Sequence, residues 1–218
     1  MSRVLPILFN TDMVRAILDG RKTVTRHRVK YDINNNQEIN KNLKEQFELY
    51  DVTPRCGIPK GTIIKPPYQK GDILYVQEAW TYDSFQLRYM ADEYIEYLDE
   101  WNRQLLINED EWNSAGSMTK GLARIWLKVT DVRVEQLQDM TLDDFLSEGV
   151  CLNPEAFNDP ENAYGQAKRI FTEIWNSTIR KPDQDLYGWD ANPWVWVIGF
   201  EKCEKPEEEK ENGKQYDN

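Results

Sequence analysis

Histidine and cysteine are scarce in this chain, which has one histidine and three cysteines in 218 residues. Histidine is the usual proton carrier near neutral pH and the commonest metal ligand, so a Ser-His-Asp triad has His27 alone as its base. Metal sites with two or three histidines are excluded. Cys56, Cys151 and Cys203 lie far apart and form no C-x-x-C pair, as zinc knuckles and thioredoxin-like motifs require. We therefore expect a reducing, cytoplasmic location and no metal or other cofactor.

Long apolar runs and glycine-rich phosphate loops are also missing. No stretch approaches the ~20 apolar residues of a membrane helix, and residues 1–10 are too short and too interrupted for a signal peptide. Neither a Rossmann glycine fingerprint nor a P-loop is present. We expect no membrane partner and no nucleotide-cofactor chemistry.

Positive charge is in short supply overall, but it is unevenly distributed. The chain has 27 Lys and Arg against 38 Asp and Glu, a net charge of −11, which argues against nonspecific coating of nucleic acid. Residues 1–30 nevertheless hold seven basic and two acidic side chains, a net +5. Residues 83–112 hold nine acidic and two basic side chains, a net −7. This distribution indicates one confined site for an anionic ligand.

Apolar alternation predicts several strands. Residues 4–9 form an apolar run broken only by Pro6, which suits a first or edge strand. Residues 73–80 and 194–200 are β-rich, and residues 122–137 alternate as one long bent strand or a hairpin would.

Helix signals lie between these strands. Thr11 is a candidate cap for a helix over residues 12–19 that Gly20 ends. Residues 141–144 (TLDD) form a capping-box pattern that predicts a helix to Glu148, ended by Gly149. A further helix is expected over residues 163–177, after Pro160.

Three segments differ in composition from this pattern. Residues 31–70 are polar and proline-punctuated, which predicts an insertion or long loop, and residues 83–117 form a second, acidic insertion. Within it, residues 86–111 have the spacing of a solvated helix. Residues 203–218 form a charged tail that we expect to be disordered. Residues 1–202 then make one α+β domain, for which an open barrel is favoured over a doubly wound sheet.

Four motifs in order resemble the ASCH domain family, whose members are small barrels similar to the PUA domain of RNA-modifying proteins. They are residues 20–26 (GRKTVTR), residues 71–80 (GDILYVQEAW), residues 122–137, which resemble a later strand pair, and residues 147–150 (SEGV). Residues 192–197 (NPWVWV), together with Y-x-x-E-x-W at residues 75–80, are similar to a subgroup common in bacteriophages. The resemblance implies a PUA-like open β-barrel of about five to six mixed strands with flanking helices. A phage-encoded member would act in the host cytoplasm.

The resemblance also implies a set of catalytic residues. A small relative hydrolyses the acetyl amide of N4-acetylcytidine with a Lys, a Thr and a Glu, which correspond here to Lys22, Thr25 and Glu148. Burial and the nearby charges of Arg21 and Arg26 would lower the pKa of Lys22, so that it could take the proton of Thr25. Alternatively, Lys22 and Glu148 form a salt bridge that keeps Lys22 charged.

Further side chains are candidates for ligand binding, since bases of single-stranded RNA stack on aromatic or arginine planes. Aromatic residues that alternate along strands are, however, also typical of a core. The ligand-binding candidates are Arg21, Thr23, Arg26, Glu78, Trp80, Arg124, Asn192 and Trp194. The expected partner is RNA or a modified nucleoside or nucleotide. Alternatively the chain is an amidohydrolase, or a phage accessory or counter-defence protein whose acidic segment, residues 83–112, mimics nucleic acid or captures a host protein.

Overall fold

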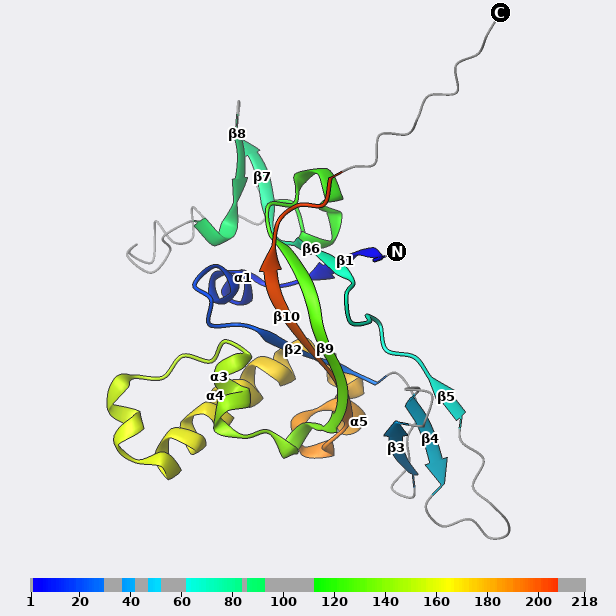
Figure 1. The fold of residues 1–218 in the computed structure, drawn as a ribbon. Coiled ribbons are helices and arrows are strands. Elements are labelled where there is room, and N and C mark those ends of the chain that lie inside the picture. Colours follow the sequence, from blue (N-terminus) through cyan, green and yellow to red (C-terminus); the bar gives the residue numbers. More distant parts are fainter. Residues whose placement is uncertain are drawn as a thin grey trace, which may run out of the picture.

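The computed structural model describes residues 2–29, 37–41, 47–51, 62–83, 86–92 and 112–207. These residues form an α+β structure around a mixed five-stranded sheet (Figure 1). The expected α+β class is therefore confirmed. The sheet strands are β1 (Val4–Leu8), β2 (Val24–Arg28), β6 (Ile73–Gln77), β9 (Trp126–Gln136) and β10 (Trp194–Cys203). The helices are α1 (Thr11–Leu18), α3 (Leu142–Ser147), α4 (Pro160–Thr178) and the short α5 (Gln184–Tyr187).

The sheet is open and has two edges. The strand order is β1-β6-β9-β10-β2, with β1 parallel to β6 and the other neighbours antiparallel. Closure would need β1 to pair with β2, and these two strands lie at opposite ends of the order. The described strands thus form a sheet and not a closed barrel. The alternating segment over residues 122–137 is one long strand, β9, and not a hairpin.

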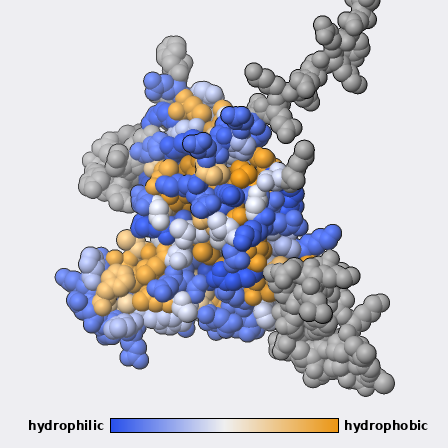
Figure 2. All heavy atoms as spheres, in the orientation of Figure 1, coloured by the Kyte–Doolittle hydropathy of each residue, from blue (hydrophilic) through white to orange (hydrophobic). Residues whose placement is uncertain are grey.

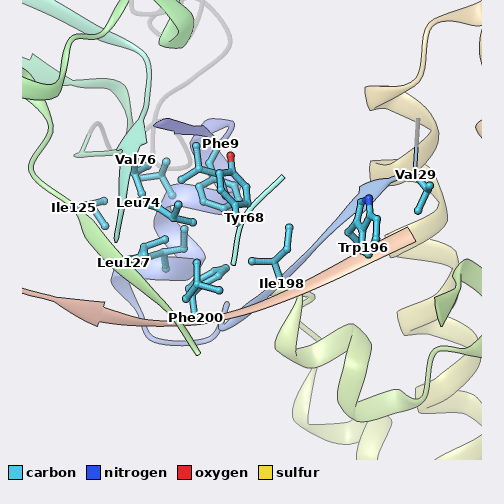
Figure 3. Close-up of a cluster of buried hydrophobic side chains, with 14 of the residues drawn as sticks. Phe9, Val29, Tyr68, Leu74, Val76, Ile125, Leu127, Trp196, Ile198 and Phe200 are labelled. Carbon is cyan, nitrogen blue, oxygen red and sulfur yellow. The ribbon is translucent and has the colours of Figure 1, made fainter. Parts of the chain in front are cut away.

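Both faces of the sheet are buried at β10, which explains its almost continuous apolar sequence. Trp196, Ile198 and Phe200 face α1 and one core cluster, which also contains Phe9, Leu74 and Leu127 (Figure 3). Val195 and Val197 face a second cluster, built with Phe145 of α3 and Phe171 and Trp175 of α4. The two layers of helices therefore cover opposite faces of one strand.

The helix boundaries follow local capping rules with one correction. Asn10, and not Thr11, caps α1: its side chain accepts a hydrogen bond from the Met13 N–H, so Thr11 is the first helical residue. The capping box of α3 is confirmed, because Thr141 and Asp144 exchange hydrogen bonds at the start of the helix. Gly20 and Gly149 follow α1 and α3 with φ values of 77° and 98°, which glycine adopts at helix ends.

The segments expected as insertions carry strands of their own. Residues 37–41, 47–51 and 62–64 form a separate three-stranded sheet of β3 (Gln37–Lys41), β4 (Phe47–Asp51) and β5 (Thr62–Ile64). Strands β7 (Trp80–Asp83) and β8 (Gln86–Tyr89) form a hairpin. The helix expected from residue 86 is therefore wrong at its start, because residues 86–89 pair with β7. The remainder of that prediction, residues 93–111, and the tail from residue 208 lie outside the described residues.

The surface is largely polar, as Figure 2 shows for one face. Apolar side chains are nevertheless exposed at a few positions, including Leu8 and Phe157. Among the described residues, none of the helices combines the length and the apolar character needed to cross a bilayer.

Candidate functional site: a pocket at the edge of strand β2

A buried ion pair joins the loop after α1 to the end of α3. The Lys22 ammonium donates to the Glu148 Oε2 at 2.5 Å, to the Glu148 main-chain oxygen at 3.0 Å and to the Val24 oxygen at 2.9 Å. The side chain of Lys22 is 0% exposed and that of Glu148 is 5% exposed. Three acceptors around one nitrogen match the three donors of a protonated lysine. The geometry is therefore that of a salt bridge.

The close approach of these elements depends on Gly149. A Cβ atom there would lie 2.8 Å from the Ala16 Cβ and 3.2 Å from the Lys22 Cβ. Glycine therefore allows the end of α3 to pack directly against α1 and Lys22.

Arg26 lies on β2 and binds three carboxylates. Its guanidinium donates to Glu148 at 3.2 Å, to Asp144 at 2.8 Å and to Glu135 at 3.3 Å, and its side chain is 0% exposed. The Nε–H of Arg26 is buried with no acceptor among the described residues. Asp144 also belongs to the capping box, so one carboxylate both starts α3 and orients Arg26. The positive charge expected of this guanidinium is thus neutralised inside the protein.

The pKa values of Lys22 and Asp144 in this cluster are both lowered, but for different reasons. Burial lowers the pKa of Lys22 below its ordinary value; the Glu148 carboxylate opposes this shift, and the charge of Arg26 adds to it. Burial raises the pKa of Asp144, but hydrogen bonds from Thr141 and Arg26 outweigh it, and the pKa is lower than usual. Of the two arginines expected to act on Lys22, Arg26 contributes to its lowered pKa.

The main cavity lies at the outer edge of β2 and has a volume of about 690 Å³. This volume falls within the ~300–1,000 Å³ range of small-molecule sites. α1 and the end of β1 border it on one side, and the C-terminal part of α4 borders it on another. Its aromatic lining residues are Phe9, Tyr68, Trp175 and Trp196, and its basic ones are Arg26, His27, Arg28 and Lys65. None of the described lining residues is acidic, although the protein as a whole carries −11.

The three expected catalytic residues do not share this cavity. Thr25 lines it from β2, whereas Glu148 lines a separate cavity of about 70 Å³ and Lys22 lines neither. A space of 70 Å³ is too small for a nucleoside, because a single water molecule already takes up ~30 Å³ of liquid volume. Lys22 and Glu148 meet each other, but they lie behind the wall of the larger cavity.

Arg21 and Thr23 flank Lys22 and are both exposed. The Arg21 guanidinium donates to Asp19 and to the main-chain oxygen of Gly149, so it ties the loop to the end of α3. The Thr23 N–H donates to the Ser147 oxygen at 2.9 Å. Both residues hold the loop in place, and neither lines the main cavity.

Glu78 and Arg124 form a second cluster with each other. The Arg124 guanidinium donates to both carboxylate oxygens of Glu78, at 2.9 and 3.0 Å, and also to Asp92. It lies over the ring of Tyr89, 4.0 Å from the centroid. Burial raises the pKa of Glu78, while the hydrogen bonds from Arg124 oppose the shift. This cluster joins the β7–β8 hairpin to the sheet and contributes no residue to the main cavity.

Trp80, Asn192 and Trp194 occupy structural positions. The Trp80 indole N–H donates to Ser117, and its ring contacts Tyr82. Asn192 has a φ of 46° and accepts the Gln138 N–H, which fixes the turn before β10. Trp194 begins β10 and packs against the first core cluster. None of the three lines the main cavity.

Sequence reasoning missed most of the cavity wall. Phe9 and Trp175 belong to apolar patterns that are typical of core residues. Tyr68 and Lys65 lie in residues 31–70, whose polar sequence predicts an insertion or long loop. Trp196 lies in the alternating aromatic pattern of β10, which is also typical of a core, and it lines the cavity. The capping-box pattern could have led to Asp144, but not to its bond with Arg26, because that contact joins residues 118 positions apart.

Metal chemistry gains no support from the side-chain arrangement. Among the described residues, no group of three or more His, Cys, Asp or Glu side chains is placed to hold a metal ion. The carboxylates of Glu135, Asp144 and Glu148 all bind Arg26.

No protein-family model matches the chain, and neither the curated proteins nor the solved structures include a significant match.

Proposed function

We propose that the chain binds RNA, or a single nucleoside or nucleotide, in the cavity at the edge of β2. The observation that carries the proposal is the lining of that cavity, which combines aromatic rings with basic groups and, among the described residues, no carboxylate. Rings bind the faces of nucleobases, and basic groups attract phosphate. The volume of about 690 Å³ suits one nucleotide, and a duplex would not enter it.

The basic groups at the cavity are not equivalent. The Arg26 guanidinium is buried and neutralised by three carboxylates. Arg28, by contrast, is partly exposed and has one carboxylate, that of Asp183, at 3.7 Å, while its guanidinium lies 4.6 Å from the centroid of the Tyr187 ring. Lys65 is exposed and lines the cavity. We therefore assign the phosphate contact to Lys65 and Arg28.

The ASCH and PUA-like resemblance enters here as part of the proposal. Its support is the mixed sheet and the location of the GRKTVTR motif, which leads into β2 beside the cavity. A cytoplasmic location belongs to the same proposal, since Cys151 and Cys203 are both free thiols.

The geometry favours binding over amide hydrolysis. A general base needs an unprotonated nitrogen within hydrogen-bonding reach of its nucleophile. The Lys22 nitrogen instead donates to three oxygens, all from Val24 and Glu148. We therefore do not assign a reaction to Lys22, Thr25 and Glu148.

The proposal is tested by filling the cavity. Thr178 is exposed and lines the cavity, whereas the adjacent Ser177 is exposed and does not. We expect isothermal titration with the four ribonucleoside monophosphates and short single-stranded RNA to detect binding. Thr178→Trp should abolish it, and Ser177→Trp should leave it unchanged. Absence of binding by every one of these ligands would overturn the proposal.

The phosphate contact has its own matched pair of variants. Lys65→Ala should weaken the binding of a monophosphate about three- to tenfold and flatten its salt dependence, because one screened charge contact is lost. Lys70→Ala removes an exposed lysine that is not part of the cavity lining and should have little effect. Equal losses in the two variants would mean that only the general charge of the protein matters.

A further inference from the structure

The outer edge of β2 presents main-chain groups to the cavity. β2 pairs with β10 on one side, and it is the last strand in the described sheet order. The Val29 N–H donates to the Trp194 oxygen, and the Phe200 N–H donates to the Thr23 oxygen. In an antiparallel pair, every second residue of a strand bonds to the partner strand through both its N–H and its C=O, and the residues between them point these groups away from the partner. Positions 23, 25, 27 and 29 therefore face β10, and positions 24, 26 and 28 direct their N–H and C=O groups outward.

Exposure identifies Arg26 as the residue whose main chain is accessible. Arg26 as a whole is 5% exposed, but its side chain is 0% exposed. Its accessible surface therefore belongs to the main chain. Arg26 lines the cavity and its side chain is inaccessible, so the part of Arg26 that reaches the cavity is main chain and not the guanidinium. The buried network of carboxylates holds the side chain on the other face, and this fixes the orientation of the main chain.

We propose that the N–H and C=O of Arg26 recognise the hydrogen-bonding edge of a nucleobase. This inference rests on the proposed function and names the group of the ligand that enters the cavity. In an extended residue the two groups lie side by side and form a donor beside an acceptor. The Watson–Crick edge of a nucleobase offers the complementary acceptor beside a donor. Each nucleobase can thus form two in-plane hydrogen bonds here while its faces contact the aromatic walls.

The chemistry of the edge favours a base over an added peptide strand. Strand addition requires a continuous series of free main-chain groups. The Val24 oxygen already accepts a hydrogen bond from Lys22, so only positions 26 and 28 of β2 remain as complete pairs. Asn10 and Met13 on one side and Thr178 and Ile179 on the other border the same cavity. A compact planar group fits this short interval better than an extended chain does.

The test uses amide hydrogen exchange in the whole, ¹⁵N-labelled protein. In the free protein, the outward amide of Arg26 should exchange faster than the paired amides of Thr25 and His27. Among the four ribonucleoside monophosphates, the one that binds most tightly should slow exchange at Arg26 by about tenfold, as one new hydrogen bond predicts. Exchange at Thr25 serves as the internal control and should not change. Slow exchange at Arg26 in the free protein would overturn the inference, because the edge would already be occupied.

Two analogues of that nucleotide complete the test. Methylation of the ring nitrogen on the Watson–Crick edge, N3 of a pyrimidine or N1 of a purine, should weaken binding at least about tenfold. Methylation at C5 of a pyrimidine or C8 of a purine keeps the edge and should have a much smaller effect. If the nucleotide binds but both analogues bind equally and Arg26 is unprotected, the inference fails while the proposed function stands. If no nucleotide binds, the proposed function fails, and the inference fails with it.

Discussion

Two buried glutamates in this molecule each bind an arginine, but their surroundings differ. Glu148 binds both Lys22 and Arg26, whose side chains are 0% exposed, and it lies where α1, α3 and β2 meet. Glu78 binds Arg124, which is 27% exposed and also reaches the exposed Asp92. The first cluster forms the wall behind a cavity, and the second attaches a hairpin. Only the first cluster adjoins the cavity and the last strand of the described sheet, so it belongs to the candidate site and the second cluster does not.

The largest expected effect is the loss of the Glu148 charge. Glu148→Gln leaves two buried cations with fewer counter-charges, which should lower the free energy of unfolding by about 3–5 kcal/mol. Urea denaturation followed by tryptophan fluorescence measures this change. A loss below about 1 kcal/mol would contradict the burial of the pair. Lys22→Met is a second variant for comparison, because it removes one of the two buried cations, which then no longer requires a counter-charge.

A somewhat smaller effect is expected at Gly149, which has no counterpart in the second cluster. Gly149→Ala combines a φ of 98° with a Cβ atom 2.8 Å from the Ala16 Cβ. The backbone strain and the overlap together should cost about 2–3 kcal/mol. Gly20→Ala is the control: its φ is 77°, but no atom lies within 4 Å of the added Cβ. Equal losses in the two variants would mean that backbone strain alone is responsible.

Glu78→Gln tests the second cluster. Arg124 keeps Asp92 and its contact with the Tyr89 ring, so we expect a loss of about 1–2 kcal/mol, less than at Glu148. The same denaturation experiment provides the comparison. Nucleotide binding should be unchanged in Glu78→Gln, since the residue does not line the cavity. A larger loss here than at Glu148 would reverse the ranking of the two clusters.

The smallest effect concerns acid pH. The pKa of Asp144 in the folded protein is lower than usual, so its contribution to stability is complete above the unfolded pKa of about 3.9 and disappears as the pH falls through the folded value. Asp144→Asn should therefore cost about 1 kcal/mol at pH 7 and less at pH 3. Thermal unfolding at both pH values measures the difference. A cost that does not depend on pH would show that the carboxylate charge is not the stabilising feature.

Local signals in the sequence predicted much of the fold. The capping box of α3, the glycines after α1 and α3 and the apolar run of β10 act over a few residues, and each led to the correct element. Residues 86–89 form a strand because they pair with β7, which the spacing of their apolar residues did not reveal. The open sheet likewise depends on which strands become edges, and strand order is a property of distant pairings.

The candidate site was predicted less completely for the same reason. The GRKTVTR motif led to Lys22 and Arg26, and both lie beside the cavity. Their side chains, however, bind carboxylates from α3 and β9, and the cavity wall comes from residues with ordinary core signals. Sequence patterns identify charged residues, but they do not show whether the charge or the main chain of a residue faces the ligand.

The other edge of the sheet has a consequence for aggregation. β1 bonds to β6 through its odd-numbered positions. The main-chain oxygen of Arg3 accepts from the Ile73 N–H, and the Phe9 N–H donates to the main-chain oxygen of Gln77. Pro6 therefore faces outward, where it has no N–H, and its oxygen accepts a hydrogen bond from the Tyr68 hydroxyl. The middle of this edge thus has neither a donor nor an unengaged acceptor with which to recruit a strand from another chain. A Pro6→Val substitution would restore the donor, and with it a route to fibrous association.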